Sequence, residues 1–380
     1  MHQQNARIVH CVRSPVGGIF RHIEDLIRHQ SAEGNAVGLI YDSLTEGPVE
    51  RAHAERMAPY LALGAHTVPM ARSLGPADAF SVMRIHRLVR SMAPDILHGH
   101  GAKGGAYSRM LGGLNSIMRR PLVTLYSPHG GSLHYDPQSL KGKLFFSLER
   151  FLERWTSSLV FVCQYEKNVY SNKVGSPCCP AAVIHNGVRP EEFEPVAEAD
   201  SISDFVFFGT LRDLKGPDLF LSAITQLPSE TRADIVGDGP DRPRYEAMAA
   251  ELGLKERITF HGSRPPRETF GLGRCVVMPS RAESFPYAVL EALAAAKPVI
   301  TTNVGGISEM FQASDSRLIP ADDVASLVTA MAQFQQNTTA WQARAQDEQL
   351  FIKTHFQASQ MAETVSNLYR DLLRSVSATS

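Results

Sequence analysis

The sequence has 380 residues, long enough for two domains, and its 43% hydrophobic and 20% charged residues exclude a disordered, collagen-like or disulfide-scaffold chain. The formal net charge is −1, yet residues 1–185 hold 20 Lys and Arg against 13 Asp and Glu, whereas residues 186–380 hold 18 against 26. Twelve of the 14 histidines also lie in the first half, so the two halves are expected to bind different ligands.

The cysteines and the N-terminus bear on the cellular compartment. The five cysteines form no C-x-x-C pair, so a structural zinc site is not expected, and such a set is typical of a reducing compartment. The first residues lack the apolar core of a secretory signal, and no apolar run approaches the roughly 18 residues that cross a bilayer. We therefore expect a cytoplasmic protein, with peripheral attachment to the inner face of a membrane left open.

Apolar runs alternate with helical patterns along the first half. Arg7–Val12 is predicted as a buried strand, and a helix follows the turn-like Ser14–Gly18. The further strands predicted here are Val37–Tyr41, Asp95–His98, Leu122–Tyr126, Leu159–Cys163 and Ala182–Ile184, and the further helices are Ala77–Met92 and Ser139–Trp155. This alternation predicts a parallel sheet covered by helices on both faces.

A proline-containing, acidic segment at 189–203 interrupts this rhythm and is predicted as a linker between domains at 1–188 and 204–355. The rhythm restarts with a strand at Phe205–Phe208. It continues with predicted strands at Ala233–Val236, Ile258–Phe260, Cys275–Met278 and Val299–Thr301, predicted helices at Leu219–Leu227, Asp241–Leu252 and Pro286–Ala295, and a helical tail from Asp322. The predicted fold is α/β, with two doubly wound Rossmann-like domains, a cleft between them, and ligands beyond the carboxyl ends of the strands.

Two loops after predicted strands suit phosphate groups. Gly17 and Gly18 stand between the first strand and its helix, where the backbone can approach an anion; a plain tight turn is the alternative. Arg212 and Lys215 lie in the loop Gly209–Gly216, and two cations there suit a diphosphate; a solvated loop is the alternative. Neither loop matches G-x-G-x-x-G, so a nicotinamide cofactor is not expected.

The most specific segment follows the predicted strand Cys275–Met278. Glu283 lies in the loop after this strand, and Glu291 lies eight residues further on, inside the next predicted helix. Between them, Ser284 and Phe285 precede the helix start, where backbone N–H groups have no partner within the helix. This spacing suits contacts with two parts of a long ligand rather than an acid/base pair.

Histidines follow two strands of the first half. His98 and His100 alternate at the end of one strand, so both face one side, as metal ligands or as hydrogen-bonded polar residues. His129 follows the strand Leu122–Tyr126, as a site residue or as a core histidine. No D-x-D pattern occurs in the sequence, so cations and backbone amides, rather than a metal, are expected to hold a diphosphate.

Taken in this order, the glycine pair Gly17–Gly18, the Lys215–Gly216 loop and the Glu283 to Glu291 segment resemble the retaining GT-B glycosyltransferases of the family-4 type, also called group 1. The segment Val183–Val188 resembles the domain boundary of that family. The resemblance implies a nucleotide-sugar donor in the second domain and an acceptor in the first. It also implies that a helix at 356–380 returns to the first domain.

The resemblance further implies residue roles. Glu283 and His129 are the implied catalytic residues, because Glu283 contacts the donor sugar and His129 lies near its anomeric carbon. Arg212 and Lys215 would hold the diphosphate, and Glu291 the ribose. The other implied donor-binding residues are Gly17, Gly18, Ser284 and Phe285, and the acceptor-side residues are His98, His100 and Lys103.

Two positions depart from the family pattern. Thr210 stands directly after Gly209, where the family often has arginine, so Arg212 is the candidate substitute. Pro286 stands where the family often has a glycine, and a proline removes one backbone donor from the donor-binding loop.

We therefore expect a retaining glycosyltransferase that moves a sugar, from a UDP-sugar as first choice, to a hydroxyl of a sugar or lipid-linked sugar in polysaccharide or glycoconjugate biosynthesis. No metal, other cofactor or nucleic acid is expected. The alternatives are a UDP-sugar 2-epimerase of the same fold, a non-enzymatic nucleotide-sugar binder and an oxidoreductase.

Basic residues gather on two predicted helices of the first half. Lys141 and Lys143 precede the apolar Leu144–Phe146, and Arg84 and Arg87 lie on the helix Ala77–Met92. They bind an anionic membrane surface or an anionic acceptor, or they form solvated helix faces.

Overall fold

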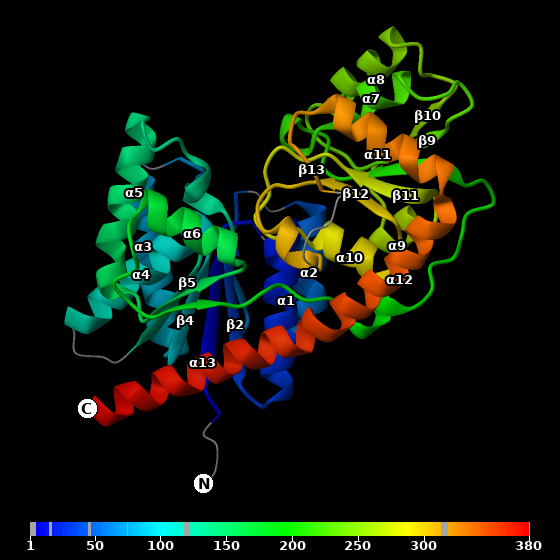
Figure 1. Ribbon diagram of the computed structural model, residues 1–380. Helices are drawn as coiled ribbons and strands as arrows, with labels where there is room; N and C mark the ends of the chain where they lie inside the picture. The colour runs from blue at the N-terminus through cyan, green and yellow to red at the C-terminus, as the bar shows by residue number, and fades with distance from the viewer. Residues whose placement is uncertain are drawn as a thin grey trace. The chain divides into compact units, whose positions relative to one another are not determined.

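The computed structural model describes residues 5–14, 17–44, 47–73, 75–117, 122–312 and 318–379 (Figure 1). The chain divides into two compact units, Met1–Asn186 with Ala358–Ser380, and Gly187–Gln357. Each unit is built from parallel strands alternating with helices, which confirms the predicted fold class. The predicted linker, 189–203, is part of the second unit.

The described part of the first unit holds a seven-stranded sheet in the order β3-β2-β1-β4-β5-β6-β7. Its strand pairings are parallel, and β1 lies between β2 and β4, as in other doubly wound sheets. The strands are β1 (Arg7–Val12), β2 (Ala36–Asp42), β3 (Ala65–Val68), β4 (Ile96–His100), β5 (Val123–Ser127), β6 (Ser158–Phe161) and β7 (Ala181–Val183). The helices are α1 (Gly17–Ala32), α2 (Pro48–Met57), α3 (Ala77–Met92), α4 (Gly101–Ile117), α5 (Leu140–Leu152), α6 (Gln164–Lys173) and α13 (Ala358–Thr379).

The described part of the second unit holds a six-stranded parallel sheet in the order β10-β9-β8-β11-β12-β13. The strands are β8 (Ser203–Phe208), β9 (Ala233–Val236), β10 (Ile258–Phe260), β11 (Gly273–Met278), β12 (Val299–Thr302) and β13 (Leu318–Ile319). The helices are α7 (Pro217–Thr225), α8 (Arg242–Glu251), α9 (Pro266–Phe270), α10 (Tyr287–Ala294), α11 (Val324–Gln336) and α12 (Thr338–His355).

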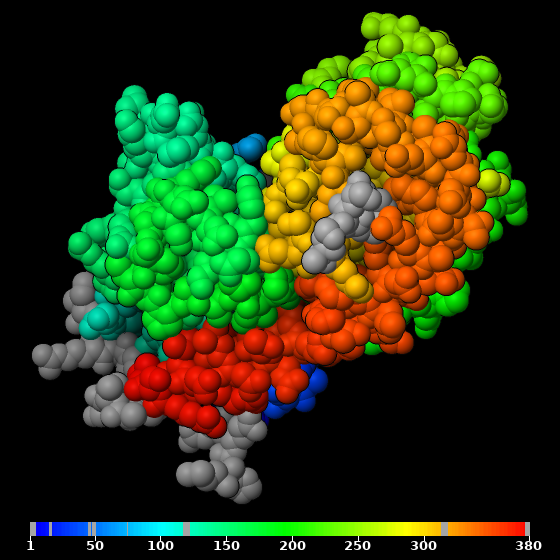
Figure 2. All heavy atoms as spheres, in the orientation of Figure 1, coloured from blue at the N-terminus to red at the C-terminus, as the bar shows by residue number. Residues whose placement is uncertain are grey.

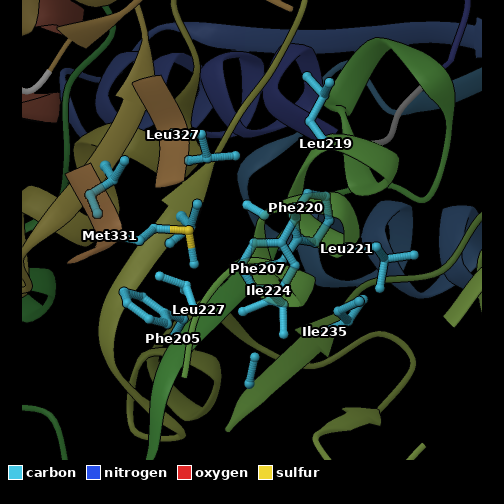
Figure 3. Packing of buried hydrophobic residues seen from close by; sticks show 14 of the residues in the cluster. Phe205, Phe207, Leu219, Phe220, Leu221, Ile224, Leu227, Ile235, Leu327 and Met331 are labelled. Atoms are coloured by element: carbon cyan, nitrogen blue, oxygen red, sulfur yellow. The ribbon is translucent and has the colours of Figure 1, made fainter. Parts of the chain in front are cut away.

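The core of the second unit lies between its sheet and the helices α7 and α11. Phe205 and Phe207 alternate on β8 and point to the same side, where they pack against Phe220 of α7 and Met331 of α11 (Figure 3). Burying such side chains stabilises each by about 1.5–3 kcal/mol. This packing fixes α7, and with it the loop that joins β8 to α7.

The C-terminal helix α13 packs on the first unit, although it follows the whole second unit in sequence. Its apolar residues Met361 and Val365 are buried against residues of β1, β4 and β5, and Leu368 is partly buried with them. This spacing of apolar residues is helical, as the sequence predicts. Figure 2 shows the helix (red) lying along the surface of this unit.

Several elements differ from the sequence prediction. The helix α4 was not predicted, because its five glycines lower its helix propensity. They allow close packing instead, since a Cβ at Gly104 or Gly105 would collide with β1 or with Tyr126 of β5. The helix expected at Ser139–Trp155 ends at Leu152 and continues as a 3-10 turn. Other missed elements are β3, β13, α2, α6 and α9.

A search of the helices among the described residues finds none that is both long and apolar enough to cross a membrane.

Candidate active site

The loops after β8 and β11 meet in the second unit, because these two strands are neighbours in the sheet. Lys215 Nζ, in the loop after β8, lies 2.5 Å from Glu283 Oε1, in the loop after β11. The hydroxyl of Ser280 also donates to Glu283 Oε1, at 2.7 Å. The structure therefore joins two predicted site residues that lie 68 positions apart in sequence.

Gly216 sets the position of Lys215. Its φ is +70°, a left-handed conformation that favours glycine, and it lies so close to the carbonyl of Pro279 that a Cβ would collide with that oxygen. The loop after β8 therefore packs directly on the end of β11. A side chain at position 216 would move Lys215 away from Glu283.

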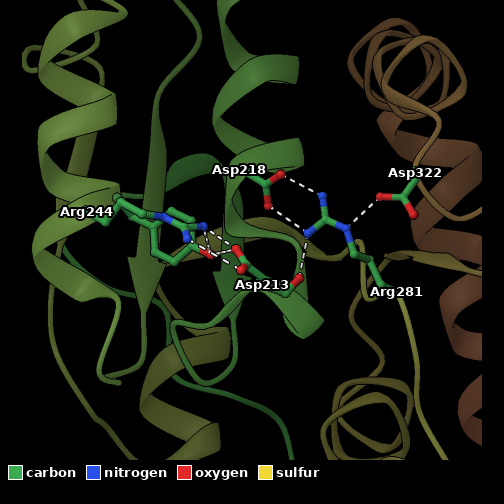
Figure 4. Close-up of polar contacts among 6 residues, drawn as sticks. Asp213, Asp218, Arg244, Arg281 and Asp322 are labelled. Atoms are coloured by element: carbon green, nitrogen blue, oxygen red, sulfur yellow. Dashed lines mark hydrogen bonds and ion pairs between the residues drawn. The ribbon is translucent and has the colours of Figure 1, made fainter. Parts of the chain in front are cut away.

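Arg281 ties the same two loops together (Figure 4). Its guanidinium pairs with Asp218 of α7 at 2.6 Å and with Asp322 at 2.6 Å, and it donates to the carbonyl of Asp213 at 2.5 Å. The hydrogen bond with Asp218 is the main reason that the pKa of Arg281 is raised. Arg281 thus holds the Lys215 loop against β11. The sequence analysis missed this residue, for which the only signal was its place two positions before Glu283.

The cations around this loop divide into paired and unpaired groups. Arg244 of α8 pairs with Asp213, whose carboxylate also accepts a hydrogen bond from Tyr245 at 2.9 Å. Arg212 is exposed, and no partner of its guanidinium is found among the described residues. Arg212 is therefore available to a ligand, whereas Arg244 and Arg281 are occupied.

The segment after Glu283 leads into α10. Ser284 is half-buried, and its carbonyl accepts a hydrogen bond from the N–H of Gly306 at 2.7 Å. The ring of Phe285 is buried, 5.7 Å from the ring of Phe356, and anchors the loop in the domain core. Glu291 is buried on α10, in the second turn of the helix.

In the first unit, a chain of histidines lies at the carboxyl ends of β1, β4 and β5. His10 Nδ1 lies 3.0 Å from His100 Nε2, and His100 Nδ1 lies 3.1 Å from His129 Nε2. At the other end, His10 Nε2 lies 2.9 Å from the side-chain oxygen Oε1 of Gln30 in α1. The structure thus brings His100 and His129 together and adds His10 and Gln30, which the sequence analysis missed.

His98 and His22 flank this chain. His98 and His100 do face one side of β4, with ring centroids 4.1 Å apart. The ring nitrogens of His98 contact the Tyr369 hydroxyl at 2.6 Å and the Ser127 hydroxyl at 2.9 Å. His22 Nδ1 contacts Asn186 Oδ1 at 3.0 Å, and its Nε2 has no partner among the described residues.

Burial keeps these histidines neutral. It lowers the pKa of His10 to about 4, against a smaller raising effect of the hydrogen bond with Gln30. It also lowers the pKa of His22 to about 4, and holds the pKa values of His98, His100 and His129 well below the ordinary value. The cluster is therefore a set of neutral hydrogen-bonding groups at pH 7.

Among the residues that the structure describes, two sets of three histidines bring one ring nitrogen each within 4.8 Å of one another, as a metal site requires. The sets are His10, His98 and His100, and His22, His100 and His129. In the first set, both nitrogens of every ring already have a hydrogen-bond partner. Both sets share His100, so a metal there would displace one of its hydrogen bonds. This geometry favours the hydrogen-bonded alternative for His98 and His100.

A cavity of about 280 Å³ lies beside these histidines, within the first unit. Its lining includes Arg13, Arg72, His100 and Lys103. The Lys103 ammonium is already paired with Asp78 at 2.5 Å, whereas Arg13 and Arg72 have no carboxylate partner among the described residues. The cavity lining therefore includes two cations, Arg13 and Arg72, that have no carboxylate partner among the described residues.

Gly17 and Gly18 begin α1 and are exposed. A Cβ at Gly17 would meet no atom within 4 Å, so the space beside it is open to a ligand. The preceding residues 15 and 16 lie outside the described part of the chain.

Comparisons with known proteins agree with this architecture. Residues 16–192 match the family model for glycosyltransferase family 4, and residues 203–337 match the model for glycosyl transferases group 1. The two models together account for most of both units.

Named relatives belong to the same class. The uncharacterised glycosyltransferase MJ1178 of Methanocaldococcus jannaschii is 26% identical over 302 residues, which cover 78% of each chain. The UDP-Gal:alpha-D-GlcNAc-diphosphoundecaprenol alpha-1,3-galactosyltransferase of Escherichia coli is 25% identical over 67% of this chain and 70% of its own length. The crystal structure of Anabaena Alr3699/HepE in complex with UDP-glucose shares the fold, with a TM-score of 0.79 and 18% identity over 97% of this chain and 100% of the other. The chain is a group 1 glycosyltransferase with the GT-B fold.

Proposed function

We propose that the chain is a retaining glycosyltransferase that moves a sugar from a nucleoside-diphosphate sugar to a hydroxyl acceptor, in polysaccharide or glycoconjugate biosynthesis. The contact of Lys215 with Glu283 carries this proposal. It puts a cation and a carboxylate together at the edge of the sheet where doubly wound domains bind nucleotides. The UDP-Gal in the name of the E. coli relative and the UDP-glucose in the HepE structure support a UDP-sugar as the first donor to test.

In the proposed complex, the second unit holds the donor. An ammonium has three N–H donors, so Lys215 can keep its contact with Glu283 and still bind a phosphate oxygen. Arg212 supplies a second, unpaired cation to the diphosphate, and Glu291 accepts a hydrogen bond from the ribose. Ser284 and Phe285 contribute through the loop that leads to α10, and Gly17 and Gly18 of the first unit contribute backbone N–H groups.

The proposed chemistry needs no covalent intermediate. The acceptor oxygen attacks the anomeric carbon on the face from which the diphosphate leaves, and the electrons of the breaking C–O bond pass to the diphosphate. The acceptor proton goes to an oxygen of that leaving group. Lys215 and Arg212 stabilise the charge that develops there, and Glu283 holds both the sugar and Lys215.

The first unit is proposed to position the acceptor. In this proposal, His129 contacts the donor sugar, and His98, His100 and Lys103 bind the acceptor. His100 and Lys103 are part of the cavity lining. The cavity also has apolar walls, including Ile19, Phe145 and Leu148. Cations beside apolar walls suit an acceptor that carries both an anionic group and a lipid.

A peripheral membrane attachment fits the same unit. The helix α5 exposes Leu140, Leu144 and Phe151, with exposed fractions of 86%, 59% and 46%. Lys141 and Lys143 stand exposed between them. Apolar side chains flanked by cations are typical of helices that lie on an anionic membrane surface.

The proposal is tested by incubating the protein with UDP-glucose, UDP-galactose and UDP-N-acetylglucosamine, each with and without an undecaprenyl-diphosphate-linked sugar. We expect release of UDP that depends on the acceptor, a product whose anomeric configuration matches the donor, and activity that survives EDTA. Isomerised UDP-sugar without an acceptor would indicate the 2-epimerase instead. Binding of donor without turnover would indicate a nucleotide-sugar binder.

A further inference from the structure

An unbroken hydrogen-bond chain runs from the interior of the first unit to His129. It begins at Gln30 of α1, passes through His10 of β1 and His100 of β4, and ends in the loop after β5. The successive distances are 2.9, 3.0 and 3.1 Å. Gln30 and His10 are fully buried, His100 is 1% exposed, and His129 is half-buried.

All hydrogen bonds of this chain must point the same way, because each neutral imidazole carries one hydrogen and one acceptor lone pair on its two nitrogens. The Gln30 oxygen can only accept, so His10 carries its hydrogen on Nε2 and accepts at Nδ1. His100 must then donate from Nε2 and accept at Nδ1. His129 must therefore donate from Nε2, which leaves a lone pair on its Nδ1.

No histidine of this hydrogen-bond chain binds a second proton at pH 7. Burial lowers the pKa of His10 to about 4 and holds the pKa values of His100 and His129 well below the ordinary value. The backbone of His129 is fixed as well, at a φ of +51°, and the N–H of the following Gly130 donates to Glu166 at 2.5 Å. Both the orientation and the protonation of this ring are therefore determined by its surroundings.

We infer that Gln30, His10 and His100 are positioning residues that hold His129 in the tautomer with hydrogen on Nε2 and a free acceptor at Nδ1. Resting on the proposed function, this assigns His129 a single role beside the donor sugar. It accepts a hydrogen bond from a sugar hydroxyl, and it neither donates one from Nδ1 nor carries a positive charge. A buried amide thus sets the chemistry of a residue two rings away.

Only one other arrangement of hydrogens is self-consistent. If the NH₂ group of Gln30 faced His10, every hydrogen in the chain would shift to the opposite nitrogen, and His129 would present an N–H at Nδ1. A metal bound between His100 and His129 would remove the hydrogen between them altogether. These arrangements differ in an observable way.

The test is ¹⁵N NMR of the full chain labelled with [¹⁵N]histidine, after treatment with a chelator. The His129 signals are assigned by their loss in the His129→Asn variant. We expect a protonated Nε2 and an unprotonated Nδ1 at pH 7. A protonated Nδ1, a doubly protonated ring, or one equivalent of tightly held transition metal in the protein as purified would overturn the inference.

A pair of variants tests whether Gln30 determines the tautomer of His129. In Gln30→Met the acceptor at the start of the chain is lost, so a mixture of His129 tautomers is expected. In Gln335→Met, which removes a half-buried glutamine of α11 whose side chain bonds to Thr231, the His129 spectrum should stay unchanged. An unchanged single tautomer in Gln30→Met would contradict the positioning role, and the wild-type spectrum decides the tautomer even if this variant does not fold.

Activity gives an independent readout. Loss of one neutral hydrogen bond to the sugar should lower kcat of Gln30→Met by about 2- to 12-fold, with the KM of the donor changed less. If no donor is turned over by the wild type, the proposed function fails, while the NMR result still decides the tautomer.

Discussion

The two units share one architecture, yet the polar groups at the carboxyl edge of the sheet are neutral in the first unit and charged in the second. The first unit places neutral, buried histidines at the ends of β1, β4 and β5. The second places charged, partly exposed groups at the ends of β8 and β11. Cut at the unit boundaries, the first unit holds 22 Lys and Arg against 15 Asp and Glu, and the second 16 against 24.

This difference matches the tasks proposed for the units. A diphosphate gains charge as it leaves, so it is best stabilised by cations that stay partly solvated and need little desolvation. A sugar hydroxyl is neutral, so neutral groups with fixed hydrogen-bond directions can also bind it. One fold can therefore serve both ligands when the residues in and after the carboxyl ends of its strands differ.

The largest effect is expected from Glu283, which contacts Lys215 and the hydroxyl of Ser280. Glu283→Gln keeps the size of the side chain but removes its charge, so kcat should fall by about 10²- to 10³-fold. The matched control is Glu251→Gln, at an exposed position at the end of α8. Steady-state kinetics with near-normal turnover in Glu283→Gln would refute the assigned role.

Smaller effects, on the affinity for UDP, are expected from Lys215 and Arg212, and the two residues should differ in size of effect. A hydrogen bond to a charged group contributes about 1.5–3 kcal/mol, so Lys215→Ala should weaken UDP binding by about 10- to 150-fold. Arg212→Ala should cost less, because this exposed side chain is not held in place by other groups. Calorimetry should show almost no binding in the double variant and normal binding in the exposed control Lys255→Ala. Unchanged affinity in the double variant would exclude both residues from the diphosphate site.

The histidine cluster predicts that acid destabilises the first unit before the second. His10 and His22 have folded-state pKa values of about 4, below the ordinary 6.5 of the unfolded chain. As the pH falls from 6.5 to 4, the unfolded chain binds protons that the folded chain does not, so the free energy of unfolding decreases. Each histidine should remove about 1.4 kcal/mol per pH unit in this window.

Each unit contains one of the two tryptophans, Trp155 and Trp341, so fluorescence can follow the units separately. In Trp341→Phe, urea unfolding reported by Trp155 should shift to lower urea between pH 7 and pH 5. In Trp155→Phe, the transition reported by Trp341 should shift much less. Equal shifts in both variants would mean that the histidines do not account for the difference.

The smallest effect concerns the membrane. Each Lys or Arg near an anionic surface contributes about 1 kcal/mol, within a Debye length of roughly 8 Å at physiological salt. The protein should sediment with anionic liposomes at low salt and be released at high salt. Neutralising Lys141 and Lys143, and then Arg84 and Arg87, should weaken sedimentation stepwise, whereas Lys255→Gln should not. Equally poor binding to anionic and neutral liposomes at low salt would favour a soluble acceptor.

Local sequence patterns determined most of the architecture. Buried strands such as Arg7–Val12 and Ala233–Val236 and the helix Ala77–Met92 are predicted to the residue, because their apolar periodicity and their end signals are local. The short strands β3 and β13 and the glycine-rich helix α4 were missed. Their stability comes from packing on neighbours, which no local pattern records.

The candidate site was likewise predicted in part from the sequence and completed only by the tertiary structure. Motif spacing and the family resemblance together pointed to Lys215, Glu283 and His129, and loops after parallel strands must lie at one edge of a sheet. Only the tertiary structure brought Lys215 against Glu283, placed Arg281 between the loops, and joined Gln30 and His10 to His129. These contacts link positions between 20 and 90 residues apart, and their geometry depends on how strands pair and helices pack, so the sequence could name the participants of the site but not the hydrogen bonds among them.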